Sequence, residues 1–515
     1  MNKNLPAWLE NAVFYQIYPQ SFCDSNGDGI GDLKGIISKL DYIKELGCNA
    51  IWINPCFESP FLDAGYDITN YYNVAERYGT NEDLKNVFQE AHKRRMHVLL
   101  DLVPGHTSME HPGYQKSALA EQNEYSDRYI WTSNVWDIPE QSYIRGFSER
   151  NGCCLTNYYS HQPSLNYGFF ERDPLKTWQQ SPSAEGPRAN VQELKNIMRF
   201  WLNMGCDGFR VDMAPSLIKN DPERKGVIAL WQEFRGMLDD EFPEAAMISE
   251  WGEPDKSIEA GFHMDFILPF RPFNTNALFR NKPYFSSKAG GSAKEFVNNY
   301  KKMYDDTNDQ GLICIPTSSH DCGRISGALS REELKLAYAF ILTMPGAPFI
   351  YYGDEIGMRP IGNLKSVEGS YGRNNSRTPM QWNNEPNAGF SSADPKKLYL
   401  PLDPDENRPT VEKQQADENS LLRETQCLIE LRKQHSALQS YAKVEFISDE
   451  TPLIYCRQDE NEKITVCINT GDSPITVSKP QGDVIYRNGD FAEQGEEIVL
   501  QKQTAVIFAK CLHNI

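Results

Sequence analysis

Short apolar runs alternate with longer amphipathic stretches over most of the chain. Eight runs are typical of buried parallel strands: Ala12–Tyr18, Ala50–Ile53, His97–Leu102, Gly208–Val211, Ala246–Ser249, Asp265–Leu268, Ile313–Thr317 and Phe349–Tyr352. Helical spacing of apolar residues is found between them, at Leu33–Leu46, Asn81–Arg95, Gln192–Asn203 and Ile228–Leu238. Eight strands that alternate with helices predict an α/β fold, a closed TIM (β/α)8 barrel, with an open doubly wound sheet as the alternative.

Two irregular regions interrupt this alternation, and a different pattern follows it. A long segment rich in aromatic residues, Asn, Ser and Pro separates the third predicted strand from the next helix, which predicts an inserted subdomain. Beyond the helical run at 419–435, short alternating segments bounded by Gly, Asp and Pro predict an antiparallel β domain. The predicted domains are a barrel at 1–104 and 178–435, an inserted subdomain at 105–177, and a C-terminal β-sandwich at 436–515.

The balance of charge limits the classes of partner. Acidic residues outnumber basic ones by 71 to 52 among 515 residues, for a formal net charge of −19. Such a surface repels nucleic acid and anionic membranes and suits a neutral substrate, although solubility alone also explains it. No run is apolar enough for a signal peptide or a membrane-spanning helix. The 12 cysteines are scattered without a CxxC pair, so we expect reduced thiols in a cytoplasmic protein.

Polar residues gather where the predicted strands end. In a (β/α)8 barrel the carboxyl ends of the strands face the active site. The third, fourth, fifth and seventh strands are followed, in that order, by Asp101 with His106, Arg210 with Asp212, Glu250, and His320 with Asp321. One such acid is commonly a cap or a member of an ion pair. So many carboxylates at one mouth are costly to bury unless they act on something.

Glycoside hydrolysis uses this set of groups. One carboxylate attacks the anomeric carbon, and a second, with a raised pKa, protonates the leaving oxygen. An adjacent arginine keeps the nucleophile ionised, while histidines and a further acid hold the sugar hydroxyls. The spacing predicts this class of chemistry and leaves open which acid has which role.

Four ordered motifs carry a resemblance to a known family. They are Asp101–His106 (DLVPGH), Gly208–Asp212 (GFRVD), Ile248–Trp251 (ISEW) and Ser319–Asp321 (SHD). With these motifs the chain resembles the α-amylase family of glycoside hydrolases and transglycosylases (family 13), and more closely its oligo-1,6-glucosidase and α-glucosidase branch. The similarity begins at the segment VFYQIYP, residues 13–19, and extends into the C-terminal β domain.

The resemblance implies a role for the residues of these motifs. Asp212 would be the nucleophile, Glu250 the general acid/base, and Asp321 the group that stabilises the oxocarbenium-like transition state. His106 and His320 would bind hydroxyls of the same sugar ring. The family is retaining, so the resemblance also implies a covalent glucosyl-enzyme intermediate and two carboxyl groups roughly 5–5.5 Å apart.

Further substrate contacts follow from the same resemblance. Arg210 would position the nucleophile, and Tyr66 would lie under the sugar as a stacking platform. Asp67 would close the pocket on the non-reducing end of the glucose, with Arg377 as its ion-pair partner. A pocket closed behind one glucose unit predicts an exo-acting enzyme for which long polymers are poor substrates.

Several positions depart from the usual residues of this branch. Ser164 stands where Asp is usual in the segment QPSLN. Pro104–Gly105 replaces Val-Asn, which weakens any inference of an amylase-type calcium site there. Cys322–Gly323 replaces Asn-Pro, which leaves the acceptor-side contacts open. Met213 follows the nucleophile, where Val marks α-1,6 and Thr or Ala marks α-1,4 preference, so the linkage stays open as well.

We therefore expect an exo-acting retaining α-glucosidase that releases terminal α-linked glucose from short oligosaccharides or disaccharides. The alternative is a glucosyltransferase or isomerase of the trehalose synthase or sucrose isomerase type, because acceptor choice depends on loops and water exclusion. A non-catalytic relative, such as the ectodomain of an amino-acid transporter heavy chain, is disfavoured because all three acids are present and no anchor is. The Asp67 and Arg377 motifs disfavour an endo-acting α-amylase. We expect a monomer or homodimer with no nucleic-acid or membrane partner.

The loop after the first strand has the pattern of a metal site. Residues 24–32 (DSNGDGIGD) offer an oxygen at every second position, as do the first nine positions of an EF-hand loop. The ligands would be Asp24, Asn26, Asp28, Ile30 through its carbonyl, and Asp32. Gly35 stands at the twelfth position instead of Glu, and the flanks are strand and helix, which argues against a calcium sensor. The oligo-1,6-glucosidase branch has this loop, so the resemblance implies a structural Ca²⁺ (or Mg²⁺) there rather than a polar turn without metal.

Overall fold

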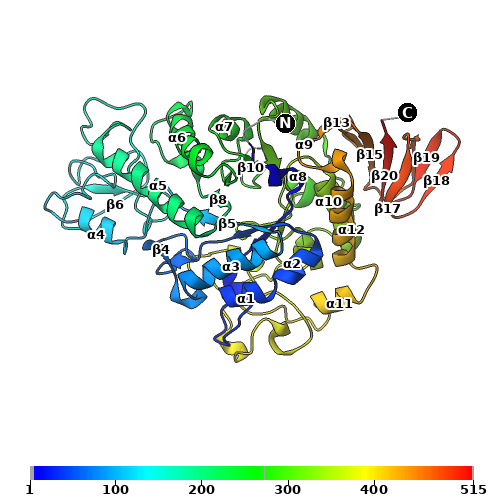
Figure 1. Ribbon diagram of the computed structural model, residues 1–515, viewed down its shortest axis with the longest axis horizontal. Coiled ribbons are helices and arrows are strands. Elements are labelled where there is room, and N and C mark those ends of the chain that lie inside the picture. The colour runs from blue at the N-terminus through cyan, green and yellow to red at the C-terminus, as the bar shows by residue number, and fades with distance from the viewer. Residues whose placement is uncertain (1–4, 272, 513–515) are drawn as a thin grey trace.

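Eight parallel strands form the central barrel (Figure 1). The computed structural model describes residues 5–271 and 273–512. In sheet order the strands are β11 (Leu312–Cys314), β10 (Met264–Phe266), β9 (Ala246–Ser249), β8 (Gly208–Val211), β5 (His97–Leu102), β2 (Ala50–Ile53), β1 (Phe14–Ile17) and β12 (Phe349–Tyr351). Strands β11 and β12 stand at the two ends of this order. They are linked just beyond β11, where Pro316 forms a parallel bridge with Phe349 and the Thr317 amide donates to the Phe349 carbonyl at 2.9 Å. The predicted TIM barrel is confirmed; β10 and β11 begin one residue earlier than predicted.

Helices surround the barrel. They are α1 (Leu33–Ser38), α2 (Leu40–Leu46), α3 (Asn81–Lys93), α5 (Glu185–Met204), α6 (Lys225–Glu241), α7 (Pro254–Glu259), α8 (Asn276–Phe279), α9 (Lys294–Asp306), α10 (Arg331–Thr343), α11 (Val411–Gln415) and α12 (Leu421–Gln434). The stretch predicted as one helix at 33–46 is two helices, because Lys39 leaves the helical conformation (φ −113°, ψ 5°). Helix α3 begins with a capping box in which Thr80 and Asp83 exchange hydrogen bonds.

Apolar side chains fill the barrel interior. Phe14 of β1 stacks on Phe349 of β12 with ring centroids 4.2 Å apart, and Phe266 of β10 packs edge-on against Phe349. Gly208 begins β8 with φ +144°, and a Cβ there would lie 2.0 Å from the Ala246 carbonyl oxygen, so this close approach requires glycine. A packed interior of this kind fixes the strand ends that carry the polar residues.

An inserted region separates β5 from α5. Its elements, and the hairpin that follows β2 beside it, are α4 (Pro112–Ser117), β6 (Tyr143–Arg145), β7 (Cys153–Leu155), β3 (Phe57–Glu58) and β4 (Asn70–Val74). In Figure 1 the inserted region lies at one end of the molecule and the C-terminal domain at the other. The limits predicted for the inserted subdomain, 105–177, stay a prediction.

Two antiparallel sheets form the C-terminal domain. The larger has the order β13 (Lys443–Ser448), β14 (Leu453–Gln458), β15 (Glu462–Asn469), β20 (Thr504–Cys511) and β17 (Asp483–Asn488). The smaller has the order β16 (Ile475–Ser478), β19 (Glu497–Leu500) and β18 (Phe491–Gln494). Buried side chains of both sheets meet, including Ile498 and Leu500 of β19 with Val506 and Phe508 of β20. The predicted C-terminal β domain is confirmed.

Two buried arginines donate to carbonyls at the end of α10, and one of them, Arg457, joins the C-terminal domain to the barrel. Arg432 of α12 donates to the carbonyls of Leu342, Met344 and Gly346, at 3.0, 2.8 and 2.5 Å. Arg457 of β14 donates to the Thr343 carbonyl at 2.5 Å. Burial lowers the pKa of Arg432 to about 9 and the pKa of Arg457 to about 10. The carbonyls at the end of α10 thus receive the charged donors that a helix C-terminus favours.

The described part of the chain, 5–271 and 273–512, contains no helix with the length and apolar character needed to cross a membrane. All twelve cysteines lie in this part, and none of them forms a disulfide there. The cytoplasmic location and the oligomeric state stay predictions.

A buried acid between helix and barrel makes stability depend on pH. Glu355 is fully buried, and its Oε1 accepts hydrogen bonds from the Tyr15 and Tyr42 hydroxyls at 2.7 and 2.6 Å. Burial raises the pKa of Glu355 to about 7, although the two hydroxyls oppose the shift. Because the pKa of Glu355 is higher in the folded than in the unfolded chain, its protonation favours the folded state. This contribution to stability is complete below the pKa of the unfolded chain and is lost as pH rises toward the pKa of the folded chain.

We expect Glu355→Gln to remove this dependence, because the amide stays neutral. The free energy of unfolding of the variant minus that of the wild type should increase by on the order of 3 kcal/mol from pH 4.5 to pH 7.5. Urea unfolding across that range measures the difference, with exposed Glu385→Gln as the matched control. A difference between variant and wild type that stays constant with pH would contradict the assignment.

Candidate active site

The carboxyl ends of the barrel strands open into a cavity of about 480 Å³. Its lining consists of Asp63, Tyr66, His106, Tyr158, Gln162, Asp212, Met213, Glu250, Phe270, Arg271, Asp321 and Arg373. All three acids predicted to be catalytic belong to this set, together with the predicted sugar contacts Tyr66 and His106. The arginine and histidine of the strand-end motifs, Arg210 and His320, lie buried behind the lining and contact it.

Arg210 holds three carboxylates together. Its Nη1 donates to Asp101 Oδ1 at 2.8 Å and to Asp212 Oδ1 at 3.0 Å, and its Nη2 lies 2.9 Å from Glu250 Oε2. Asp101 and Arg210 are register partners on the parallel strands β5 and β8, which brings these two side chains side by side. All four side chains are at least nine-tenths buried. The structure therefore has Arg210 beside Asp212, where the sequence predicted it.

Burial opposes the ionisation of two of these acids, Asp101 and Asp212. Burial raises the pKa of Asp101 to about 6, although Arg210 opposes the shift. Burial and the neighbouring Glu250 raise the pKa of Asp212 well above its ordinary value, again against Arg210. Asp212 therefore holds a proton more tightly than an isolated carboxyl group does. A nucleophile and an acid that work together need one proton between them.

His320 is neutral and held in one tautomer. Its Nδ1 accepts hydrogen bonds from the Gln16 and Asn54 side-chain amides at 3.0 and 3.2 Å, which assigns the proton to Nε2. That Nε2 lies 2.8 Å from the Tyr66 hydroxyl and 2.9 Å from Asp321 Oδ2. Burial lowers the pKa of His320 to about 4, although Asp321 opposes the shift. The imidazole is thus a fixed hydrogen-bond donor toward the cavity.

His106 is held by both of its ring nitrogens. Its Nε2 donates to the Tyr66 carbonyl at 3.0 Å, and its Nδ1 lies 3.1 Å from the Asn157 side-chain nitrogen. Burial lowers the pKa of His106 to about 3, so the ring is neutral. The neighbouring Gly105 is explained by the same contact, because a Cβ there would lie 2.6 Å from the Asn157 nitrogen. A sugar hydroxyl must displace Asn157 before it can bond to Nδ1 of His106.

The predicted ion pair between Asp67 and Arg377 is wrong. Asp67 is fully buried and does not line the cavity. Its carboxylate accepts hydrogen bonds from the Ser59 hydroxyl and the Leu62 amide at 2.9 Å, and from the Asp63 amide at 3.1 Å. These donors of its own tight loop occupy both carboxylate oxygens, so Asp67 shapes the loop and does not line the cavity.

Arg377 supports another acid of the site. It is fully buried, and its Nη2 donates to Asp321 Oδ1 at 3.1 Å while its Nε donates to the His320 carbonyl at 2.7 Å. Arg373 Nη1 reaches the same Asp321 oxygen at 2.7 Å. Burial raises the pKa of Asp321, but His320 and the two arginines outweigh burial and hold it well below its ordinary range. Asp321 is therefore a firmly ionised acid.

The ion pair on the cavity wall is Asp63 with Arg373. Asp63 Oδ1 lies 2.9 Å from Arg373 Nη2, and the Gln162 side chain donates to Asp63 Oδ2 at 2.8 Å. Both charged residues line the cavity, and sequence reasoning missed both. Each stands four residues before the member of the predicted pair, Asp67 or Arg377. The sequence does contain a signal for them, because an Asp and an Arg each occur twice, four residues apart. Either Asp could therefore have been paired with either Arg.

The residue after the nucleophile has an unusual backbone. Met213 lies in the left-handed region (φ 41°, ψ 42°), which costs energy in any residue except glycine. This conformation directs its amide to Glu250 Oε2 at 3.0 Å and leaves its side chain on the cavity wall. The strained turn after Asp212 thus positions Glu250.

The predicted metal loop curls through side-chain to backbone hydrogen bonds. Asp24 Oδ2 accepts from the Gly29 amide at 2.8 Å, and Asp32, the N-cap of α1, accepts from the Ser25 and Gly35 amides at 2.7 Å. Among the described residues, no three His, Cys, Asp or Glu side chains form a cluster that could hold a metal ion. The Asx turns are those of an EF-hand-like loop, and the prediction of a bound cation stays untested.

The comparison with known proteins decides the family. The model described as alpha amylase, catalytic domain, matches residues 16–441. The chain belongs to the α-amylase family. An oligo-1,6-glucosidase from Parageobacillus thermoglucosidasius is 31% identical over 577 residues, which span 97% of this chain and 98% of that protein. The resemblance stated from the motifs is confirmed, and this α-amylase-family member is a glycoside hydrolase or glucosyl-transferring relative.

Relatives named as trehalose or isomaltulose synthases are also similar to this chain. The trehalose synthase/amylase TreS of Mycolicibacterium smegmatis is 31% identical over 483 residues, which span 84% of this chain and 77% of that protein. Among solved structures, an isomaltulose synthase variant from Erwinia rhapontici NX5 in complex with sucrose has a TM-score of 0.83 at 26% identity, covering 98% of this chain and 99% of that one. Similarity alone does not choose between hydrolysis and transfer.

Proposed function

We propose that this α-amylase-family enzyme is an exo-acting retaining α-glucosidase that releases terminal α-linked glucose from short oligosaccharides or disaccharides. The observation that carries the proposal is the Asp63–Arg373 ion pair on the cavity wall, linked through Arg373 to Asp321. A carboxylate and a guanidinium side by side accept from and donate to sugar hydroxyls and close the cavity behind one glucose unit. A cavity of about 480 Å³ suits a ligand of disaccharide size.

In the first half of the reaction, an Asp212 oxygen attacks the anomeric carbon. The bond from this carbon to the leaving oxygen breaks, and that oxygen takes the proton of Glu250. A glucosyl ester of Asp212 forms. Arg210, which bonds to both carboxylates, offsets the negative charge that moves from Asp212 to Glu250 during this step.

In the second half, the Glu250 carboxylate removes a proton from water. The water oxygen attacks the anomeric carbon from the face that the leaving group vacated, and the ester bond to Asp212 breaks. Two inversions give net retention, so α-glucose is released. Asp321 stays ionised between Arg373 and Arg377, and its charge faces the positive charge that develops on the sugar ring in both steps.

Asp63→Asn should lower kcat/KM for p-nitrophenyl α-glucoside by about 10²–10³-fold, because Arg373 loses one of its two carboxylate partners and a hydroxyl loses a charged acceptor. Arg373→Lys should cost a similar factor, since one ammonium cannot bond to Asp63 and Asp321 as a guanidinium does. Exposed Asp472→Asn is the control. Steady-state kinetics and melting curves measure the effects; near-wild-type kinetics in both variants would show that this pair does not bind the substrate.

Glucosyl transfer to a sugar is the second candidate. Phe270 is 56% exposed on the cavity wall, and Arg271 packs so closely on Gly252 that a Cβ there would lie 2.6 Å from its Cγ. Arg271 therefore lies close to the segment after β9 that contains the proton donor Glu250, and Phe270 lines the same cavity. An aromatic ring and a guanidinium there could hold an acceptor sugar in place of water.

A product time course separates the two candidates. Maltose, isomaltose, trehalose and sucrose are each offered to the purified enzyme, and products are resolved by chromatography. Free glucose as the main product from maltose or isomaltose supports the glucosidase and defines the linkage. A new disaccharide with little free glucose supports transfer or isomerisation, with the same catalytic acids.

We also propose that the loop at 24–32 binds a structural Ca²⁺ (or Mg²⁺). Asp24, Asn26, Asp28, Ile30 through its carbonyl, and Asp32 would hold the ion with oxygen ligands, and the ion would take no part in the chemistry. We expect the Tm to rise by several degrees when 1 mM Ca²⁺ replaces EDTA, on the order of a bound ion's linkage energy. Asp28→Ala should abolish this rise, whereas exposed Asp240→Ala should keep it. An equal Tm with and without Ca²⁺ would contradict the proposal.

A further inference from the structure

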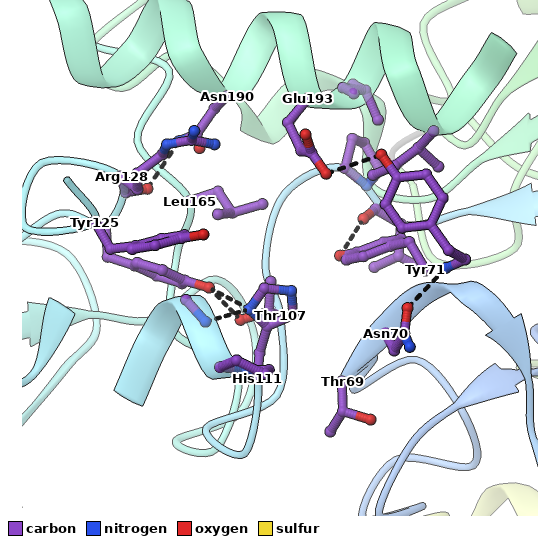
Figure 2. A pocket seen from close by; sticks show the side chains of 18 of the residues that line it. Thr69, Asn70, Tyr71, Thr107, His111, Tyr125, Arg128, Leu165, Asn190 and Glu193 are labelled. Atoms are coloured by element: carbon purple, nitrogen blue, oxygen red, sulfur yellow. Dashed lines mark hydrogen bonds between the residues drawn. The ribbon is translucent and has the colours of Figure 1, made fainter. Parts of the chain in front are cut away.

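A second cavity lies apart from the catalytic one, between the inserted region and helix α5. Its volume is about 540 Å³. Figure 2 shows Tyr125 and Arg128 on one side of it and Tyr71 on the other, with Glu193 extending from α5. None of the residues that line it belongs to the lining of the catalytic cavity.

Arg128 brings an unmatched cation to this cavity. Its guanidinium donates a long hydrogen bond, 3.4 Å from Nη1 to the Ala189 carbonyl, and its buried Nε has no partner. Within the described residues, no carboxylate forms an ion pair with it. The Tyr125 ring lies 5.5 Å from the guanidinium carbon. Buried donors of this kind are costly unless a ligand or water accepts from them.

Two carboxylates of the lining, those of Glu58 and Glu193, offer acceptors. Glu193 accepts from the Tyr72 hydroxyl at 2.9 Å, and Glu58 accepts from the Asn73 side chain at 3.1 Å, which leaves further acceptor capacity on both carboxylates. These carboxylates repel a phosphate or another anion, while Arg128 repels a cation. A neutral ligand with many hydroxyls can bond to the carboxylates and to Arg128, because each hydroxyl both donates and accepts.

Tyrosine side chains also line the cavity. They include Tyr71, Tyr72, Tyr125 and Tyr129. Aromatic rings give a polyhydroxylated ring a flat apolar face to pack against, while the charged groups bond to its rim. The volume falls within the range of small-molecule sites.

The cavity shares a wall with the catalytic site. Val103, Pro104 and Thr107 line it, and these residues flank His106, which lines the catalytic cavity. The Tyr71 hydroxyl donates to the Val103 and His106 carbonyls at 3.0 and 2.8 Å. A molecule bound here would pack against the loop that holds His106.

We propose that this cavity is a second, non-catalytic saccharide site, which binds a neutral mono- or disaccharide between Arg128 and Glu193. Arg128 would donate to the sugar hydroxyls, Glu193 would accept from them, and the tyrosine rings would pack against the sugar ring. This proposal does not depend on which sugar the catalytic site cleaves.

Saturation-transfer NMR of maltose tests the proposal. The full-length Asp212→Asn protein is used so that maltose is not consumed, and an iminosugar mimic of glucose saturates the catalytic cavity. We expect maltose to retain its transfer signal, and a titration of that signal to give a dissociation constant. Adding Arg128→Gln should raise this constant at least about tenfold, the effect of one lost charged hydrogen bond. Adding Arg172→Gln, at an exposed arginine of the same region, should leave it unchanged.

Three results would overturn the proposal. The first is complete loss of the maltose signal when the iminosugar is present. The second is a retained signal that Arg128→Gln does not weaken. The third is competition by inorganic phosphate, which would make the site an anion site. Should Arg128→Gln fail to fold, Tyr125→Ala decides by the same titration, because it removes the stacking face and keeps the charge.

Discussion

Replacing Asp212 by Asn is expected to lower kcat by about 10⁴-fold or more, because an amide cannot form the glucosyl ester. Asp212 shares the Arg210 guanidinium with Glu250, which the proposed mechanism uses for proton transfer and not for the attack. The fold should persist, since the substitution removes one of three mutually repelling carboxylates. Turnover of p-nitrophenyl α-glucoside and the melting temperature measure the two effects.

The matched control for Asp212→Asn is Asp240→Asn, at an exposed position of α6. It should retain wild-type turnover. A folded Asp212→Asn protein that keeps more than a few per cent of wild-type activity would remove this residue from the role of nucleophile.

Glu250→Gln is expected to lower turnover of maltose by about 10²–10⁴-fold, since the amide neither donates a proton to the leaving sugar nor activates water. The Met213 amide can still donate to the remaining carbonyl oxygen, so the local backbone should stay in place. The loss should depend on the leaving group. p-Nitrophenolate departs without protonation, so ester formation should survive with this substrate while ester hydrolysis remains slow.

Azide separates these two steps in Glu250→Gln. It is a nucleophile that needs no general base, so it should restore turnover of p-nitrophenyl α-glucoside and yield α-glucosyl azide. Exposed Glu253→Gln, three residues along the chain, should behave as the wild type. Absence of any azide effect, together with an equal loss for both substrates, would contradict the acid/base role of Glu250.

The barrel could be predicted from the sequence because its determinants are local. Apolar runs of strand length and helical periodicity between them follow from burial on two faces of a sheet and one face of a helix. Motif residues at the strand ends, such as Asp101 and Arg210, are then brought together by strand register alone. This is why the predicted acids converge on one cavity.

The ion pair of the cavity wall could not be chosen from the sequence. Asp63 and Asp67 stand in one loop, and Arg373 and Arg377 in another about 300 residues away. Which members meet depends on how each loop turns, and that depends on hydrogen bonds such as those from the Leu62 and Asp63 amides to Asp67. The second cavity escaped prediction for a similar reason, since it forms between segments distant in the chain.

The stereochemistry of the first product tests directly whether this enzyme is a retaining hydrolase. p-Nitrophenyl α-glucoside is hydrolysed by the purified enzyme, and proton NMR follows the anomeric signals before mutarotation equilibrates them. We expect free α-glucose as the first sugar product, formed in step with nitrophenol. Initial β-glucose, or nitrophenol release with glucosyl transfer products and almost no free glucose, would contradict a retaining hydrolase.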